Sequence, residues 1–337
     1  MKRKKILFVI PNAGFSGAEQ QLLALAIGLK KRGYNVNLCN LEGKGHFTEK
    51  AEEVGFICEV IERRSHFDLI RLIKYCVYIR QNKFNVIISF TSVANNLTRL
   101  LKFFLPFVDF FHIAGERGRD LEQVTISNWI YSKLSKLSNV IVCNSKVQRE
   151  KLISAEKINP KKLQVIYNGF DFSQCKNIST MDLHDEFGIP EGNRIICSIG
   201  NLSAHKNIPM YIEVAEKLLS ESHNICFLYI GDGVDLEKYK NEIIKRKLNK
   251  KIFFTGRRND VLAILKSCNI FILTSMWEGL PNVVIEAMAA SVPVVSTNID
   301  GVTEVITDGH NGFLVKSEDA NAMVDKIKQL MSDDALC

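Results

Sequence analysis

The 337-residue sequence has little that would place it across a membrane, in an oxidising compartment or around a metal. No apolar run reaches the roughly 20 residues that a membrane-spanning helix needs. The nine cysteines are scattered, without a CxxC pair or a neighbouring histidine cluster, so we expect reduced thiols and no metal site. The basic start "MKRKKILFVIPNAG" has only a short apolar run and no small-residue cleavage site after it, which favours a first strand over a signal peptide.

A dinucleotide-binding fingerprint is also missing. The first turn contains two glycines, Gly14 and Gly17, and lacks the three-glycine spacing of that motif. The second predicted strand, "YNVNLCNL" (34–41), contains no acid that would bind a ribose. Both absences argue against an NAD-dependent oxidoreductase.

The composition is that of a soluble globular protein, and its charge is unevenly distributed. Apolar residues make up 46% and charged residues 24%, and the length favours two domains. Residues 1–172 hold 27 Lys and Arg against 15 Asp and Glu, whereas residues 173–337 hold 17 against 22. The halves therefore carry net charges of +12 and −5, which indicates two domains with different partners. A basic half suits nucleic acid, an anionic lipid or a phosphorylated acceptor.

Strands and helices alternate in both halves, which predicts an α/β fold with parallel, doubly wound sheets. In the first half the predicted strands are 5–10, 34–41, 85–90, 111–116 and 139–145, and the predicted helices are 18–33, 68–83 and 146–154. In the second half the predicted strands are 194–200, 225–231, 251–256, 269–275, 293–297 and 313–316, and the predicted helices are 209–222, 236–248, 259–268, 281–291 and 319–333. The polar, turn-rich residues 173–193 are the predicted linker between domains 1–172 and 194–337.

Open α/β sheets bind ligands beyond the carboxyl ends of their strands, where this sequence places several glycines. At Gly14 and Gly17, backbone amides can approach an anion at the start of the first helix, although a plain turn explains both residues equally well. Glu19 suits the positive end of the helix dipole there.

Two cationic segments follow strand ends in the second half. In "IGNLSAHKN" (199–207), Lys206 precedes a helix, where it would neutralise a diphosphate, and a solvated surface lysine is the alternative. In "TGRRNDV" (255–261), Arg257 and Arg258 repeat this arrangement and would clamp phosphates. The alternative is a pair of surface arginines, one of them bonded to Asp260.

The stretch "WEGLPNVVIEAMA" (277–289) combines a tight turn, a helix start and two carboxylates. Pro281 fits the first helical turn, so we expect the nearby amides to bind a diphosphate, those of Leu280, Asn282 and Val283. Carboxylates accept hydrogen bonds from hydroxyls, so Glu278 suits a sugar and Glu286 a ribose. Because "VVIEAMAA" is apolar all round, we expect Glu286 to be buried. The alternative is a helix-dipole acid followed by an exposed helix residue.

Together these segments resemble the retaining nucleotide-sugar glycosyltransferases of family 4, whose GT-B fold has two facing Rossmann-like domains. The resemblance extends over nearly the whole chain, through "GAEQQLLALA", "VIVCNSKVQREKL", "VIYNGFD", "SIGNLSAHKN", "YIGDG", "FTGRRNDV", "WEGLPNVVIEAMAASVPVVST" and "GVTEVITDGHNGFLV". Its specific part is the E-x7-E spacing of Glu278 and Glu286.

The resemblance implies a role for each matching residue. Glu278, Lys206 and Arg117 are the implied catalytic residues. The implied donor-binding residues are Gly14, Gly17, Asn201, Lys206, Arg258, Glu278, Gly279, Leu280, Asn282, Val283 and Glu286. Two positions depart from the family pattern. Asn201 stands where Gly-Arg-Leu is usual, and Arg117 stands where many members carry a histidine, while His112 lies at the other end of that strand.

The resemblance also implies transfer of a sugar from a UDP- or GDP-sugar, with retained configuration and without a metal or other cofactor. We expect a glycan or lipid-linked acceptor in bacterial cell-surface polysaccharide or lipopolysaccharide assembly, and no nucleic acid partner. The alternatives are a nucleotide-sugar epimerase of similar fold, which needs no acceptor, and a non-catalytic nucleotide-sugar-binding protein, which the missing arginine at Asn201 favours.

A membrane surface is predicted in the basic half. The segment "NNLTRLLKFFLPFVDFF" (95–111) places Arg99 and Lys102 among five phenylalanines, and "KYCVYIRQNK" (74–83) adds further cations. We therefore expect a cytoplasmic protein with peripheral contact at the inner face of the plasma membrane. A core helix followed by a buried strand is the alternative.

Overall fold

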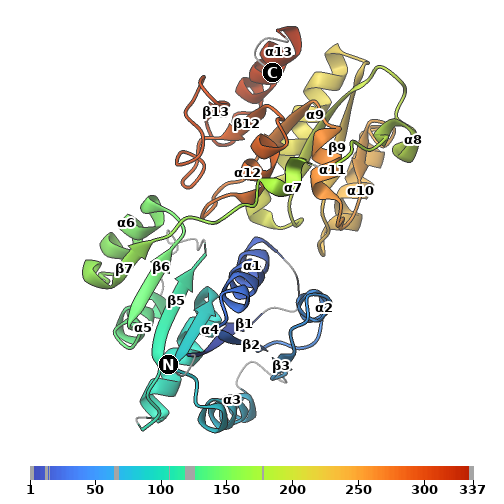
Figure 1. Cartoon of the computed structure of the whole chain (residues 1–337). Helices are drawn as coiled ribbons and strands as arrows, with labels where there is room; N and C mark the ends of the chain where they lie inside the picture. Colours follow the sequence, from blue (N-terminus) through green and yellow to red (C-terminus); the bar gives the residue numbers. More distant parts are fainter. Residues whose placement is uncertain are drawn as a thin grey trace. The chain divides into compact units, whose positions relative to one another are not determined.

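The computed structural model describes residues 4–11, 14, 16–63, 68–105, 107–117, 126–176 and 178–333, with the backbone alone at 126–130 and 176. The chain forms two compact units, Met1–Asn168 (the N-terminal unit) and Gly169–Cys337 (the C-terminal unit; Figure 1). The sequence pattern predicts that the first domain ends at residue 172. Within the predicted linker, Ser173–Lys176 (α7) and Leu183–Phe187 (α8) are helical, and Leu183 is buried in the core of the C-terminal unit.

The N-terminal unit is a seven-stranded parallel sheet in the order β3-β2-β1-β4-β5-β6-β7. Its strands are β1 (Lys5–Ile10), β2 (Asn35–Asn40), β3 (Cys58–Val60), β4 (Val86–Phe90), β5 (Phe111–Glu116), β6 (Val140–Cys143) and β7 (Leu163–Val165). Its helices are α1 (Gly17–Lys31), α2 (His46–Glu53), α3 (Leu69–Asn82), α4 (Thr91–Phe104), α5 (Ile126–Ser135) and α6 (Lys146–Ser154).

Alternating side chains of the central strand explain why helices cover both faces of this sheet. Ile6, Phe8 and Ile10 of β1 pack in a core with α1 and α2. Leu7 and Val9 point to the other face and pack with α3 and α4. A strand that is apolar at every position has to be covered on both sides, which a doubly wound sheet achieves.

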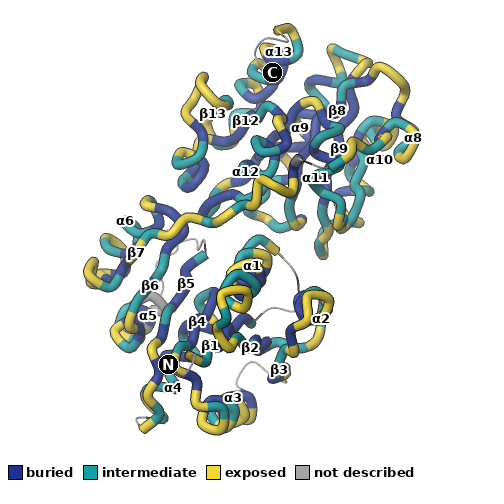
Figure 2. Tube along the Cα trace, viewed as in Figure 1, coloured by how far each residue is buried: buried dark blue, intermediate teal, exposed yellow. Residues whose placement is uncertain are grey.

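The C-terminal unit repeats this architecture with six parallel strands in the order β10-β9-β8-β11-β12-β13. The strands are β8 (Arg194–Ile199), β9 (Ile225–Ile230), β10 (Ile252–Phe254), β11 (Ile270–Leu273), β12 (Val294–Thr297) and β13 (Phe313–Val315). Helices α9 (Ile208–Glu221), α10 (Leu236–Lys245) and α13 (Ala320–Ser332) pack on one face, and α11 (Val261–Lys266) and α12 (Asn282–Ala289) pack on the other. Figure 2 shows the sheet buried beneath helices whose outer sides are exposed.

Each sheet has one point at which the strand order reverses. The reversal lies between β1 and β4 in the N-terminal unit and between β8 and β11 in the C-terminal unit. At such a point the loops after the two strands diverge to opposite faces, which leaves room for a ligand beyond their carboxyl ends. The predicted α/β class with two parallel Rossmann-like sheets is confirmed.

One prediction about the N-terminal surface is wrong. Arg99 was expected among surface cations, but its side chain is fully buried on α4. Phe110 is also buried, with the Lys102 ammonium 5.2 Å from its ring centroid. The remaining phenylalanines of this segment are exposed, namely Phe103, Phe104, Phe107 and Phe111.

Candidate functional site

A lysine and a glutamate meet at the strand-order reversal of the C-terminal unit. Lys206 ends the single 3-10 turn η2 (Ala204–Lys206) after β8, and Glu278 lies in the loop after β11. Lys206 Nζ donates to Glu278 Oε1 at 2.5 Å, and Ser275 Oγ donates to the same oxygen at 2.9 Å. The two charged side chains are only 11% and 14% exposed, so each is held in place by the other. The structure therefore brings together two of the three predicted catalytic residues.

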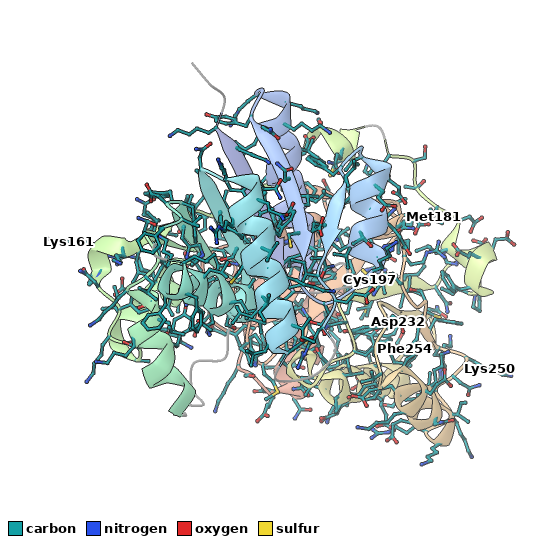
Figure 3. All side chains as sticks on the ribbon, turned by 90° about the horizontal axis from the view of Figure 1, so that it is seen from below. Lys161, Met181, Cys197, Asp232, Lys250 and Phe254 are labelled. Carbon is teal, nitrogen blue, oxygen red and sulfur yellow. The ribbon has the colours of Figure 1, made fainter. Side chains whose placement is uncertain are left out.

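Two glycines make room for this lysine. A Cβ at Gly200 would lie 2.9 Å from Lys206 Cε, so the lysine stem runs directly over the end of β8. Gly231, after β9, has a φ of 152°, and a Cβ there would lie 1.8 Å from the Gly200 carbonyl oxygen. Only glycine permits that approach of two backbones. Figure 3 labels Asp232, which follows β9, and Phe254, the last residue of β10, which pairs with β9.

Further contacts fasten the loop after β8 to the loop after β11. Thr274 Oγ1 donates to the Lys206 carbonyl oxygen at 2.9 Å, and the Met276 amide donates to the His205 carbonyl oxygen at 2.7 Å. The His205 and Trp277 rings stack with centroids 4.4 Å apart. Burial, and secondarily the Lys206 charge, lowers the pKa of His205, so this imidazole is neutral at neutral pH. The stack thus adds no charge beside Lys206.

The turn after Glu278 leads into the start of α12. Gly301 has a φ of 80°, and a Cβ there would lie 2.2 Å from the Gly279 carbonyl oxygen, so the loop after β12 supports this turn from behind. Pro281 is the N-cap and offers no side-chain acceptor. Among the residues that the structure describes, nothing accepts a hydrogen bond from the Leu280 or Val283 amide. With Asn282, these residues form the expected helix start, at which an anion would be stabilised.

Glu286 lies on the second turn of α12 and is half-buried, not buried as its apolar neighbours predicted. Only the face with Val284 and Ala287 packs against the sheet. Even so, desolvation raises the pKa of Glu286 to about 7. Among the described residues, no hydrogen bond or ion pair involves its carboxyl group.

The two arginines after β10 have different surroundings. Arg258 donates to both carboxylate oxygens of Asp260, at 2.8 and 2.6 Å, and to Glu186 of α8 at 2.5 Å. These hydrogen bonds raise the pKa of Arg258 and occupy its guanidinium, so no described contact joins it to Lys206 or Glu278. Arg257 is exposed and is the cation that remains accessible beside this strand end.

Asn201, at the position where an arginine was expected, is exposed at the end of β8. Its Oδ1 accepts a hydrogen bond from Ser203 Oγ at 3.0 Å. The side chain is therefore used to shape the loop that leads to Lys206.

Gly14 lies between β1 and α1, as predicted, whereas Gly17 is the first residue of α1, because the helix begins one residue earlier than the sequence pattern indicates. Both are at the strand-order reversal of the N-terminal unit. The adjacent residue, Ser16, is the N-cap of α1, and its amide donates to Glu19 Oε2 at 2.8 Å. Glu19 is therefore part of a capping box, which agrees with its interpretation as an acid of the first helical turn.

Arg117 follows β5 in the N-terminal unit. Its guanidinium carbon lies 4.4 Å from the centroid of the Phe90 ring, and Nη1 donates to Asn168 Oδ1 at 2.5 Å. A Cβ at Gly115 would lie 2.8 Å from Phe90, so this glycine provides the space for the ring on which Arg117 stacks. Burial lowers the pKa of Arg117 to about 10, which leaves it charged at neutral pH.

The residues around Lys206 can bind a diphosphate that carries hydroxyl groups. One ammonium and the start of α12 supply positive potential, while two carboxylates supply acceptors for hydroxyls. In the described part of the chain, no group of three His, Cys, Asp or Glu residues is placed to hold a metal ion. The helices of the described residues include none that is long and apolar enough to cross a membrane.

Sequence reasoning missed the supporting contacts of this site. Thr274 contacts Lys206, and Trp277 stacks on His205, across more than 60 residues of sequence, while Ser275 donates to Glu278 from three residues before it. The only signal for them was that His205 and Trp277 adjoin the two charged residues within the motifs.

Two family models match the chain. Residues 15–174 match "Glycosyltransferase Family 4", and residues 180–337 match "Glycosyl transferases group 1". Together the two matches cover nearly all of the chain, one on each unit.

Named relatives and a solved structure agree with these matches. The chain is 25% identical to the UDP-Gal:alpha-D-GlcNAc-diphosphoundecaprenol alpha-1,3-galactosyltransferase of Escherichia coli, over 80% of this chain and 72% of that protein. It is 23% identical to the capsular polysaccharide biosynthesis glycosyltransferase CapM of Staphylococcus aureus, over 91% and 83% respectively. The structure of Anabaena Alr3699/HepE in complex with UDP and glucose superposes with a TM-score of 0.87 at 20% identity, covering 99% of this chain and 91% of that one.

Proposed function

Since this chain belongs to glycosyltransferase family 4 and has the GT-B fold, we propose that it moves a sugar from a nucleoside diphosphate sugar to a lipid-linked or glycan acceptor, with retention of configuration. The observation that carries the proposal is the Lys206–Glu278 pair, which is held at the strand-order reversal of the C-terminal unit. A mere surface lysine would not be 11% exposed and bonded to a carboxylate from another loop.

Each part of the donor has a matching group in the C-terminal unit. The start of α12 and Lys206 bind the diphosphate, because they combine backbone donors with a full positive charge. Glu278 accepts hydroxyls of the transferred sugar, and Glu286 accepts those of the ribose. The donor is a UDP- or GDP-sugar, and a protein of similar fold is described in complex with UDP and glucose.

Catalysis on this proposal is electrostatic. As the bond between the anomeric carbon and the β-phosphate oxygen breaks, negative charge develops on the leaving nucleoside diphosphate. Lys206 and the amides at the start of α12 stabilise that charge. The departing phosphate oxygen accepts the proton of the acceptor hydroxyl, whose oxygen bonds to the anomeric carbon from the same face. Because Lys206 already supplies positive charge at the diphosphate, we expect transfer to persist in EDTA without any metal cofactor.

The acceptor is proposed from the relatives. The Escherichia coli relative is named for an acceptor in which a sugar is joined to a diphosphoundecaprenol, and the Staphylococcus aureus relative is named for capsular polysaccharide biosynthesis. We infer a lipid-linked or glycan acceptor of cell-surface polysaccharide or lipopolysaccharide assembly for this chain, with the enzyme on the cytoplasmic side.

Helix α3 offers a surface for peripheral contact with an anionic bilayer. One face of α3 is buried through Arg71, Tyr75 and Ile79, at a spacing of four residues. The opposite face exposes apolar side chains at the same spacing, namely Leu69, Ile73 and Val77, with Ile70 beside them. The exposed cations Lys74 and Arg80 adjoin this row. Exposed rings lie at the end of α4, those of Phe103 and Phe104, and after it, that of Phe107. An apolar row bordered by cations is typical of helices that lie in a membrane interface.

Donor binding and transfer are tested together. Thermal shift with a panel of nucleoside diphosphates identifies the base, and release of nucleoside diphosphate from the matching donor, with and without acceptor, follows the reaction. We expect Glu278→Gln to keep nucleotide binding and to reduce transfer by about 100-fold or more, the usual cost of losing one such electrostatic contact. Lys206→Ala should weaken nucleotide binding as well.

The control is Glu213→Gln on α9, an exposed glutamate that pairs, within the described residues, with Lys217. Full transfer by Glu278→Gln would contradict the proposed role, and conversion of the donor without an acceptor would indicate an epimerase. Nucleotide binding without any transfer or donor hydrolysis would indicate a binding protein.

Membrane contact is tested by flotation with vesicles of anionic phospholipid. The wild-type protein should float at low salt and less at high salt, because screening weakens the contribution of the cations. Ile73→Asp should abolish flotation, whereas Ile244→Asp, at an isoleucine equally exposed at 56% on α10, should not. A wild-type protein that stays at the bottom at low salt would end this part of the proposal.

A further inference from the structure

Buried polar atoms without partners gather at one edge of the N-terminal sheet. Thr91 follows β4, Arg117 follows β5 and Asn144 follows β6, while Gln148 lies on the first turn of α6. Within the described part of the chain, no partner is present for Thr91 Oγ1, Arg117 Nε, Asn144 Oδ1 or either amide atom of Gln148. About nine in ten buried polar groups in proteins are hydrogen-bonded, so several unpartnered polar side chains at one edge of a sheet require an explanation. We call these four residues the β4–β6 edge.

Strand pairing places three of the four residues at neighbouring strand ends, and Gln148 lies on the first turn of the helix that follows β6, where its backbone amide donates to Ser145. Phe90 of β4 pairs with Gly115 of β5, and Glu116 pairs with Cys143 of β6. Thr91, Arg117 and Asn144 each come directly after these paired residues, at the carboxyl ends of three adjacent strands, which are spaced about 4.8 Å apart. Such an edge is where doubly wound sheets bind ligands.

The backbone at Thr91 is strained. Its φ is 72°, a left-handed conformation that is sterically unfavourable for a β-branched residue. This one residue turns the chain from β4 into α4 at the strand-order reversal of the sheet. Strain of this kind persists where it positions a functional group, and here the group is a buried hydroxyl without a partner.

Arg117 supplies an uncompensated charge. Its guanidinium is fixed by Phe90 and Asn168, both of which are neutral, and no ion pair among the described residues includes it. Arg99 in the same unit is buried beside Glu116, at 3.8 Å. A half-buried cation whose guanidinium is desolvated and has no carboxylate partner is unfavourable in the free protein and is stabilised when an anion binds.

We propose that the β4–β6 edge binds a phosphate-linked sugar of the acceptor, an inference that rests on the transferase function proposed above. Arg117 provides the charge for the phosphate, and the Thr91 hydroxyl and the Gln148 amide donate hydrogen bonds to its oxygens. Asn144 Oδ1 can only accept, so it selects a hydroxyl beside that phosphate. The donor diphosphate binds elsewhere, beside Lys206 in the C-terminal unit.

Glucose 1-phosphate is the probe, titrated by calorimetry into protein saturated with UDP. We expect it to bind, with inorganic phosphate weaker and glucose weaker still. Gln148→Met should reduce its affinity about tenfold, equivalent to losing one hydrogen bond. Because both amide atoms lack protein partners, this substitution should leave the melting temperature unchanged or higher. Gln164→Met, at an exposed position of β7, should change neither quantity.

A second variant guards against an indirect effect at Gln148. Thr91→Gly keeps the left-handed backbone without strain and removes the hydroxyl, so it should raise the melting temperature and weaken glucose 1-phosphate binding. A lower melting temperature in both variants, with unchanged binding, would mean that the edge is structural and would overturn the proposal.

UDP binding in the same samples separates this proposal from the transferase function. Two results would overturn only the proposed acceptor binding at the β4–β6 edge. Wild-type protein could bind UDP but not glucose 1-phosphate, or it could bind glucose 1-phosphate only when UDP is absent. Wild-type protein that binds no nucleoside diphosphate would instead contradict the proposed function. We expect UDP affinity to be retained in Gln148→Met and weakened in Lys206→Ala.

Discussion

At the scale of single residues, the two glutamates of the E-x7-E spacing have opposite surroundings. Glu278 accepts hydrogen bonds from Lys206 and Ser275. Glu286 has no such donor among the described residues, and burial raises its pKa to about 7. One motif thus contains a carboxylate that is already compensated and another that gains hydrogen-bond donors only when a ligand supplies them.

Glu286 should make stability depend on pH. Its folded pKa of about 7 lies above the ordinary 4.5, so the folded protein retains a proton that the unfolded chain releases within that window. Stability should therefore fall as pH rises from about 4.5 to 7, by roughly 1–3 kcal/mol, and stay low above it. Glu286→Gln should match wild type near the acid end and be more stable by that amount at about pH 8.

Urea unfolding at about pH 4.5 and at about pH 8 measures the stability difference between wild type and Glu286→Gln. The control is Glu191→Gln, at an exposed glutamate. Because the amide cannot replace a charged acceptor, Glu286→Gln should also bind UDP more weakly despite its higher stability. Parallel loss of stability in wild type and Glu286→Gln between these pH values would contradict the assignment.

At the scale of elements, a buried polar network joins α4 and α5 to β5. Arg99 of α4 lies 3.8 Å from Glu116 at the end of β5, and Tyr131 of α5 donates to that carboxylate. His112 bonds Ser89 and Ser138 in the same network, and burial holds its pKa well below the usual value, so it is neutral. The network explains how a charged residue fits inside α4, a helix that the sequence pattern assigned to a surface.

A double-mutant cycle on Arg99 and Glu116 should show strong coupling. Glu116→Gln alone leaves Arg99 buried without a counterion, which should cost about 3–5 kcal/mol. Arg99→Met combined with Glu116→Gln removes both charges and should recover much of that loss. The same cycle on the exposed pair Arg246 and Glu242 of α10 should give less than about 1 kcal/mol. Additive effects at the buried pair would show that the two charges do not depend on each other.

The contrast between Arg99 and Lys206 shows what the sequence can and cannot predict. Strands such as β9 were predicted because every residue of the strand is apolar. By contrast, α2 was missed because it is polar, and β3 was missed because it has only three residues. Lys206 and Glu278 were found because each lies within a local motif at a strand end. Arg99 was misplaced because its partners Glu116, Tyr131 and Ser138 are distant in sequence, so only the folded chain reveals its burial.

At the scale of the whole molecule, each unit has its own sheet and its own cores, and the contacts of Lys206 all lie within the C-terminal unit. The chain has two tryptophans, Trp129 in the N-terminal unit and Trp277 in the C-terminal unit. Because Trp277 stacks on His205 beside Lys206, it reports both the unfolding of its own unit and events at the donor site.

Nucleotide should therefore stabilise one unit and not the other. In Trp129→Phe, fluorescence follows the C-terminal unit alone, while far-ultraviolet circular dichroism follows both. UDP at 100 times its Kd should stabilise the fluorescence transition by about 2.7 kcal/mol, because ligand bound only to the folded state adds RT ln(1 + [L]/Kd). Circular dichroism should then resolve a second transition, that of the N-terminal unit, whose midpoint UDP does not change. In Lys206→Ala the shift should shrink at the same UDP concentration, and an equal UDP shift of both transitions would contradict UDP binding through Lys206 and the start of α12.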